Sequence, residues 1–213
     1  MTLELPPGSV IDVPHLMRAL SIGRTPLVEA IQRLALEGLL AIHPRRGTVV
    51  TEPSLAELQH VYELRDVLEG RAAALAAQRA TPADLRDLRT LASHELRQQE
   101  RGDFRQFLSS DLRLHVRVAT ATGNPFLVRG LEQLLTLNLR LWSVFFAVRG
   151  PRTEYLFTHA PLLEALQRQD PDAAEAAAIE HVHEAREVLL TMFQSPRVRR
   201  TGANLPSSLR PQS

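Results

Sequence analysis

The feature that most constrains the fold is a helical pattern that runs from about residue 54 to residue 194. This stretch is rich in Leu, Ala, Arg, Glu and Gln, and its apolar residues recur at the spacing of one helix face. Two pairs of a capping residue and a proline, Thr81-Pro82 and Asp170-Pro171, open helices, and glycine-containing turns close others. No strand pattern interrupts the stretch, so we expect a mainly α chain whose C-terminal part is an antiparallel six-helix bundle. The predicted helices are 54–80, 82–101, 103–121, 125–148, 152–168 and 171–194.

The first 52 residues have a different sequence pattern, with short apolar runs and frequent Pro and Gly. Val13–Leu20 and Thr25–Glu37 are helical patterns joined by a tight turn that contains Gly23, which is the arrangement of a helix-turn-helix motif. The β-prone runs Leu39–His43 and Thr48–Thr51 follow and predict a hairpin, or wing. We therefore expect three parts, namely a winged helix-turn-helix domain at 1–52, a helical domain at 54–194 and a disordered tail at 195–213.

Composition excludes several classes of protein. A length of 213 residues with 44% apolar residues suffices for two compact domains, and the absence of Cys rules out disulfides and thiolate metal sites. The N-terminus lacks the charged start and apolar run of a signal peptide. The longest mainly apolar stretch, Leu131–Val148, is broken by polar residues, so we expect no membrane span and a cytoplasmic protein.

The predicted head carries a set of residues suited to DNA. In a recognition helix the N-terminal residues reach the base edges of the major groove. Positive charge gathers here, with five Arg and only two acids between Arg18 and Arg46. The alternative interpretation is a small helical domain whose arginines are solvent-exposed and do not bind DNA. The candidate DNA-binding residues are Arg24, Thr25, Val28 and Gln32 on the second helix and Arg45, Arg46 and Gly47 in the wing.

Polar residues interrupt the apolar faces of three bundle helices. Asp111 and His115 are four apart on one face, and His159 and His181 lie on the core-facing sides of the fifth and sixth helices. A buried carboxylate is costly without a partner, and the four side chains together would suit a divalent ion such as Zn²⁺, Ni²⁺ or Mn²⁺. Each histidine could instead be a hydrogen-bonded structural residue, and Asp111 could simply pair with His115. His183 lies nearly opposite His181 and is expected at the surface.

The segment GRTPLVEAIQRLALEGLLAIHPRRGTVV resembles the winged head of the GntR family of bacterial regulators, and VYELRDVLEGRAAALAAQRATPADL resembles the opening of that family's FCD effector domain. The resemblance implies a ligand-responsive repressor that binds a palindromic double-stranded DNA operator as a homodimer. Six bundle helices are closer to the VanR subgroup than to the FadR subgroup. Family heads carry a further N-terminal helix, most of which this chain lacks, so we expect a truncated first helix. This chain also departs from the family pattern SRTPVREAL at two of its polar positions. It has Gly23 where the pattern has Ser, and Val28 where the pattern has its second Arg.

The resemblance also bears on the helical domain. Many FCD domains hold a metal through an Asp-x-x-x-His pair and two later histidines, which correspond here to Asp111, His115, His159 and His181. In such domains a small organic acid completes the coordination. Arg65 and Asn138 lie on core-facing stripes and are candidate effector-binding residues, although Arg65 could instead form a salt bridge with Glu69.

Two other functions fit the same residues. An Asp/His₃ site with open positions could activate water in a metallohydrolase. A truncated head could also leave a metal-binding adaptor that does not bind DNA.

Overall fold

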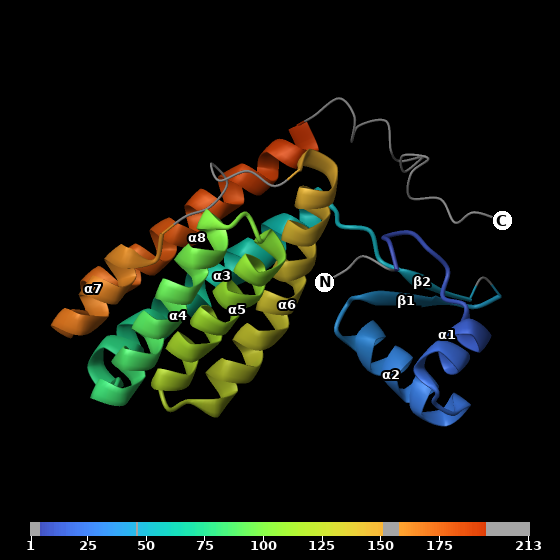
Figure 1. Cartoon of the computed structure of the whole chain (residues 1–213), viewed down its shortest axis with the longest axis horizontal. Coiled ribbons are helices and arrows are strands. Elements are labelled where there is room, and N and C mark those ends of the chain that lie inside the picture. The colour runs from blue at the N-terminus through green and yellow to red at the C-terminus, as the bar shows by residue number, and fades with distance from the viewer. Residues whose placement is uncertain (1–4, 46, 151–157, 195–213) are drawn as a thin grey trace. The chain divides into compact units, whose positions relative to one another are not determined.

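The computed structural model describes residues 5–45, 47–150 and 158–194, and it divides between Ser54 and Leu55 into two compact units (Figure 1). The predicted tail at 195–213 and Arg46 lie outside the described residues. The first unit contains α1 (Val13–Leu20), α2 (Arg24–Leu36), β1 (Leu40–His43) and β2 (Gly47–Val50). The second contains α3 (Leu55–Arg79), α4 (Pro82–Glu100), α5 (Phe104–Ala121), α6 (Pro125–Arg149), α7 (Ala160–Arg168) and α8 (Pro171–Gln194).

The first unit is the predicted helix-turn-helix with its wing. Ser21 adopts a left-handed conformation after α1, and its amide donates to the Arg18 carbonyl, which ends the helix and starts the turn. Strands β1 and β2 pair antiparallel, with Leu40 opposite Val50. A small core holds the unit together and consists of Ile11, Leu27, Ile31 and Leu40. Leu34, on the same face of α2 as Leu27 and Ile31, is 37% exposed, so the apolar stripe is only partly covered in the described head.

The second unit is the predicted helical bundle, with α3 packed along α8 and also against α5, α6 and α7 (Figure 1). Alanines of α3, including Ala73, Ala76 and Ala77, form a core with residues of α5, α7 and α8. Gly70 permits the close approach of α3 to α8, because a Cβ there would lie 2.9 Å from Cγ1 of Ile179. Among the described helices, none has the length and apolar character that a membrane crossing needs.

One helix begins later than its sequence pattern predicts. We expected a helix from 152, but α7 begins at Ala160, and residues 151–157 lie outside the described residues. Pro161 is the second residue of α7, and a proline is tolerated in the first turn of a helix because the amide it lacks would have no partner there. His159 is therefore the residue that precedes the helix rather than a member of it.

The start of α4 shows how local sequence fixes a helix end. The Thr81 hydroxyl accepts from the Asp84 amide, and the Asp84 carboxylate accepts from the Thr81 amide at 2.7 Å, which is a complete capping box. The other Asp84 oxygen lies 2.5 Å from Nη2 of Arg117 and so ties α4 to α5. The hydrogen bonds from Thr81, and then Arg117, hold the pKa of Asp84 below its ordinary value.

We predict that Asp84→Asn lowers the free energy of unfolding by about 1 kcal/mol at neutral pH, because the charge that strengthens its hydrogen bonds to Thr81 and Arg117 is lost. Because the folded-state pKa of Asp84 is lowered, its stabilisation is present above the ordinary Asp pKa of about 4 and is lost as the pH falls through the folded-state value. Urea unfolding of both proteins at neutral and acid pH measures the difference. Asp87→Asn is the matched control, since Asp87 also contacts Arg117 but its side chain is 60% exposed. Equal losses for the two variants would contradict the capping argument.

Candidate functional site

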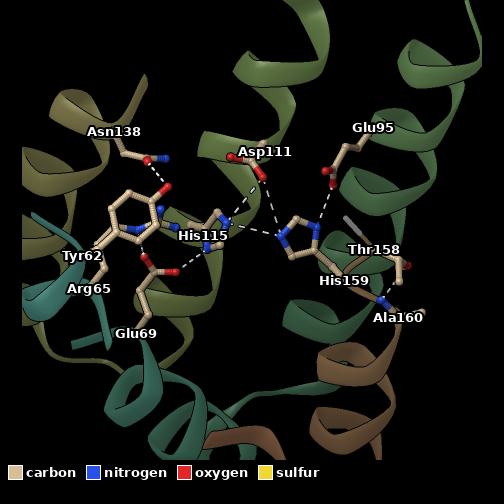
Figure 2. A network of polar contacts seen from close by, with 10 residues as sticks. All are labelled: Tyr62, Arg65, Glu69, Glu95, Asp111, His115, Asn138, Thr158, His159 and Ala160. Carbon is tan, nitrogen blue, oxygen red and sulfur yellow. Dashed lines mark hydrogen bonds and ion pairs between the residues drawn. The ribbon is translucent and has the colours of Figure 1, made fainter. Parts of the chain in front are cut away.

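Four polar side chains from three parts of the bundle converge in its interior. Figure 2 shows three of them, Asp111, His115 and His159. Asp111 and His115 lie one turn apart on α5, His159 precedes α7, and His181 lies on α8. One ligand atom from each lies within 4.8 Å of the others. The three histidines are buried, and the Asp111 side chain is 16% exposed. The sequence prediction that these four residues face the core and could meet is therefore consistent with their placement.

The closest atoms of the cluster are ring nitrogens and one carboxylate oxygen. Nε2 of His115 lies 3.3 Å from Nε2 of His159 and 3.5 Å from Oδ1 of Asp111. Nε2 of His159 lies 3.7 Å from the same Asp111 oxygen. The rings of His159 and His181 have centroids 4.2 Å apart. Two imidazole nitrogens and a carboxylate oxygen thus lie close together, and this donor set could hold a divalent transition metal.

Two further carboxylates lie behind the histidines. Oε2 of Glu69, on α3, lies 2.6 Å from Nδ1 of His115, and Oε2 of Glu95, on α4, lies 3.1 Å from Nδ1 of His159. Figure 2 shows both carboxylates reaching the rings from the side away from Asp111. The sequence interpretation missed these contacts, although the spacing of Glu95 from Leu88 and Leu91 places it on an apolar stripe of α4.

The charges around His115 change its pKa. Burial alone would lower it, but the Glu69 carboxylate and then Asp111 outweigh burial and raise the pKa of His115 to about 10. Burial would raise the pKa of Glu69, but Arg65 and His115 hold it well below its ordinary value. Burial, and then the neighbouring His159 and His115, hold the pKa of His181 well below 6.5. The neighbouring carboxylates thus favour the protonated form of His115.

The candidate effector residues belong to an adjoining network. Nε of Arg65 donates to Glu69 at 2.5 Å, so the salt bridge that we considered as an alternative is present. The Arg65 guanidinium also lies 4.8 Å from the centre of the Tyr62 ring, and the Tyr62 hydroxyl donates to Oδ1 of Asn138 at 2.7 Å. Burial raises the pKa of Tyr62 to about 12, so this hydroxyl stays a donor. The chain of contacts therefore runs from Asn138 through Tyr62, Arg65 and Glu69 to His115 (Figure 2).

A small cavity adjoins the cluster. Two candidate ligands, His115 and His181, line it together with Glu69, and the rest of its wall is apolar. Arg65 and Asn138 are not among its lining residues, so the structure does not bring these two residues to the cavity wall. The apolar lining residues are Ala72, Ala73, Val118, Leu131, Leu162 and Ala178.

His183 does not join the cluster. Its Nε2 lies 3.1 Å from Oδ2 of Asp66 on α3, and its side chain is partly exposed. This placement agrees with the expectation that His183 lies away from the apolar face that carries His181.

The candidate DNA-binding residues lie on the head. Arg24, Thr25, Val28 and Gln32 are all exposed on α2, and they occupy its N-terminal two-thirds. Arg45 is exposed in the turn of the hairpin with a left-handed φ of 69°, and Gly47 begins β2 with a φ of 84°. Arg46 lies outside the described residues. A helix with a polar exposed face and a basic hairpin is the pair of elements that a winged helix presents to DNA.

Comparison with known families matches both units. The model of the bacterial regulatory proteins of the gntR family matches residues 1–50, and the model of the FCD domain matches residues 60–184.

Several curated proteins are similar over most of the chain. The HTH-type transcriptional regulator McbR of Escherichia coli is 26% identical over 191 residues, covering 89% of this chain and 86% of that protein. The Nta operon transcriptional regulator of Aminobacter aminovorans is 30% identical over 171 residues, covering 79% of each chain. The HTH-type transcriptional repressor RspR of Escherichia coli is 26% identical over 181 residues, covering 85% of this chain and 79% of that protein. The solved structure of Escherichia coli McbR/YncC aligns with a TM-score of 0.80, covering 88% of this chain and 89% of that one.

Proposed function

The chain belongs to the GntR family of DNA-binding transcription regulators and carries an FCD domain, and from this premise we propose that it is a repressor controlled by a metal-dependent small-acid effector. Relatives such as McbR and RspR are named as regulators, so the metallohydrolase alternative is wrong and the protein is not an enzyme. The observation that carries the proposal for the helical domain is the convergence of four ligand atoms within 4.8 Å.

The proposed DNA-binding unit is a homodimer of heads acting in the cytoplasm. Two copies of α2 match the two halves of a palindromic operator, because a two-fold site needs two recognition helices one helical turn apart. Arg24 lies at the start of α2, and its proposed role is hydrogen bonding to a guanine. The proposed role of Val28 is contact with a thymine methyl. The proposed role of Arg45, Arg46 and Gly47 in the wing is contact with phosphates or the minor groove.

We predict that Arg24→Ala weakens operator binding by roughly 1–3 kcal/mol, because a base contact carries both affinity and specificity. Arg45→Ala should weaken binding to all sequences and flatten its dependence on salt, as expected of a phosphate contact. Gel-shift titration with the region upstream of the protein's own gene, at several salt concentrations, measures both effects.

The matched control for this prediction is Arg33→Ala. Arg33 lies near the end of α2, its side chain is 83% exposed and it pairs with Glu37. Equal binding by wild type, Arg24→Ala and Arg33→Ala would contradict the recognition role of α2. Failure of the wild type to bind this DNA at all would favour the adaptor alternative.

The charges of the site support a divalent cation. Asp111, Glu69 and Glu95 bring three carboxylates to the cluster and Arg65 brings one guanidinium, which leaves two negative charges to balance. Buried charges without partners are costly, and one divalent ion would neutralise the group with all three histidines neutral. Asp111, His115, His159 and His181 would hold the ion, and the ion would supply an open coordination position to a carboxylate. Carboxylate oxygen with imidazole nitrogen suits Zn²⁺, Ni²⁺ or Mn²⁺.

We predict one divalent metal ion per chain in protein purified without an affinity tag, measured by elemental analysis. His159→Ala and His181→Ala should lose the metal, whereas His183→Ala, which removes a histidine two residues from His181, should retain it. Chelation should lower the melting temperature of the wild type, because a metal that binds only the native state stabilises it. A wild type that carries no stoichiometric metal and takes none up on re-addition would reduce the cluster to a structural polar network.

The effector proposed for this domain is a small organic acid. Two of the proposed ligands line the cavity beside the cluster. The cavity is only large enough for about one water molecule, so a carboxylate that completes the coordination of the metal would have to widen it. Arg65 has a buried Nη1 for which the described residues offer no hydrogen-bond partner, and a guanidinium with a spare donor suits a carboxylate. Arg65 does not line the cavity, so its proposed role as the clamp requires its guanidinium to turn toward the effector. Asn138, through Tyr62, would support it.

We predict that the metal-loaded wild type is stabilised by small carboxylic acids and not by the corresponding amides, because only the acids can bind both metal and Arg65. A thermal-shift comparison of acid and amide pairs, repeated after chelation, measures this. Arg65→Met should abolish the shift, and Arg71→Met, an exposed position on the same helix, should leave it unchanged. Equal shifts for acids and amides would refute the proposed recognition.

A further inference from the structure

Two of the proposed metal ligands are held from behind by carboxylates of other helices. Glu69 of α3 contacts Nδ1 of His115 on α5 at 2.6 Å. Glu95 of α4 contacts Nδ1 of His159 at the start of α7 at 3.1 Å. Both glutamates are buried, at 5% and 4% exposure, so water competes little for these contacts.

The two contacts determine which ring nitrogen faces the cluster. An ionised carboxylate can only accept a hydrogen bond, so each Nδ1 must carry the proton and donate. A neutral ring that is protonated at Nδ1 has its lone pair at Nε2, and the two Nε2 atoms are the ones that lie 3.3 Å apart beside Asp111. A ring protonated at Nε2 would point a hydrogen toward the same place and could not bind a cation there.

We propose that Glu69 and Glu95 are positioning residues of the metal centre, each fixing the orientation and the Nδ1–H tautomer of one ligand histidine. The inference rests on the proposed metal binding, and it assigns a role to two residues that are not themselves ligands. A carboxylate behind a ligand imidazole also makes the ring a stronger donor to the metal, so its loss weakens binding without removing a ligand.

The two glutamates differ in what else holds them. The second oxygen of Glu69 accepts from Arg65 at 2.5 Å, so Glu69 also anchors a salt bridge within α3. The second oxygen of Glu95, Oε1, is buried and has no hydrogen-bond partner within the described part of the chain. Because a buried oxygen without a partner costs stability, the contact with His159 is the one favourable polar contact of Glu95 among the described residues. Glu95 is therefore the position at which a positioning role and a structural role can be separated.

The test is zinc affinity measured by competition with a chromophoric chelator, on full-length protein purified without a tag and stripped of metal. Glu95→Leu should bind Zn²⁺ about 10- to 100-fold more weakly than wild type. Glu95→Gln should fall between the two, because its amide oxygen still accepts from Nδ1–H but carries no charge. The melting temperature of each metal-free variant is recorded in parallel. It should stay close to that of wild type for Glu95→Gln, whose amide oxygen still accepts from Nδ1–H of His159, so that a loss of zinc affinity in this variant is not a loss of folding.

Glu57→Gln is the matched control. Glu57 is a carboxylate of α3 that pairs with Arg140 away from the four proposed ligands, and its replacement should leave zinc affinity unchanged. In zinc-loaded wild type labelled with ¹⁵N-histidine, NMR should show His115 and His159 protonated at Nδ1 and bound through Nε2. A purely structural role for Glu95 would lower the melting temperature of the metal-free variant and leave the affinity of its folded fraction intact.

The outcomes separate this inference from the proposed function. If wild type binds no zinc, the metal proposal fails and the positioning role fails with it. If wild type binds zinc but Glu95→Gln and Glu95→Leu bind it as tightly as wild type does, the positioning role alone is wrong. The same holds if zinc is bound through Nδ1 of the histidines. Should Glu95→Leu fail to fold, Glu95→Gln decides the question by the same comparison.

Discussion

Ionised groups inside an apolar helical bundle constrain every helix that contributes one. Glu69, Glu95 and Asp111 bring carboxylates from α3, α4 and α5 to one region, and each needs a hydrogen-bonding or charged partner within a few ångströms. A shift of one helix by a turn would separate such a pair and leave a buried charge alone, at a cost of several kcal/mol. The relative positions of the helices around the cluster are therefore set by these polar contacts, while the surrounding Ala and Leu residues supply most of the favourable burial.

Much of this arrangement could be predicted from the chain alone, because the relevant signals are local. Capping residues followed by proline, as at Thr81-Pro82, determine where helices begin, and α4 begins at Pro82 as predicted. Asp111, His115 and His181 were identifiable because a polar residue on an apolar face stands out at helical spacing. The beginning of α7 was predicted too early, since the apolar pattern before Pro161 resembles a helix but residue His159 does not have helical geometry.

The partners of the histidines could not be predicted, because they depend on which helices pack together. Glu69 was considered only as a partner of Arg65 four residues earlier, and it contacts both Arg65 and His115. Glu95 contacts a histidine 64 positions away, a separation over which sequence spacing carries no geometric information. The partial exposure of Leu34 in the head could not be predicted for the same reason. The apolar stripe on α2 identifies which face is apolar, but it does not identify the residues that pack on that face.

The long sequence separations within the cluster have a consequence for the unfolded chain. His115 and His159 lie 44 positions apart, yet their rings meet, so a single ion bound to both would close a long loop. Many proteins close such loops with a disulfide, which this chain cannot form because it has no cysteine. A covalent cross-link is permanent, whereas a coordination bond is in equilibrium with its surroundings. A bundle closed in this way would gain or lose part of its conformational restraint as the concentration of free metal rises and falls, and its resistance to proteolysis would follow the same variable.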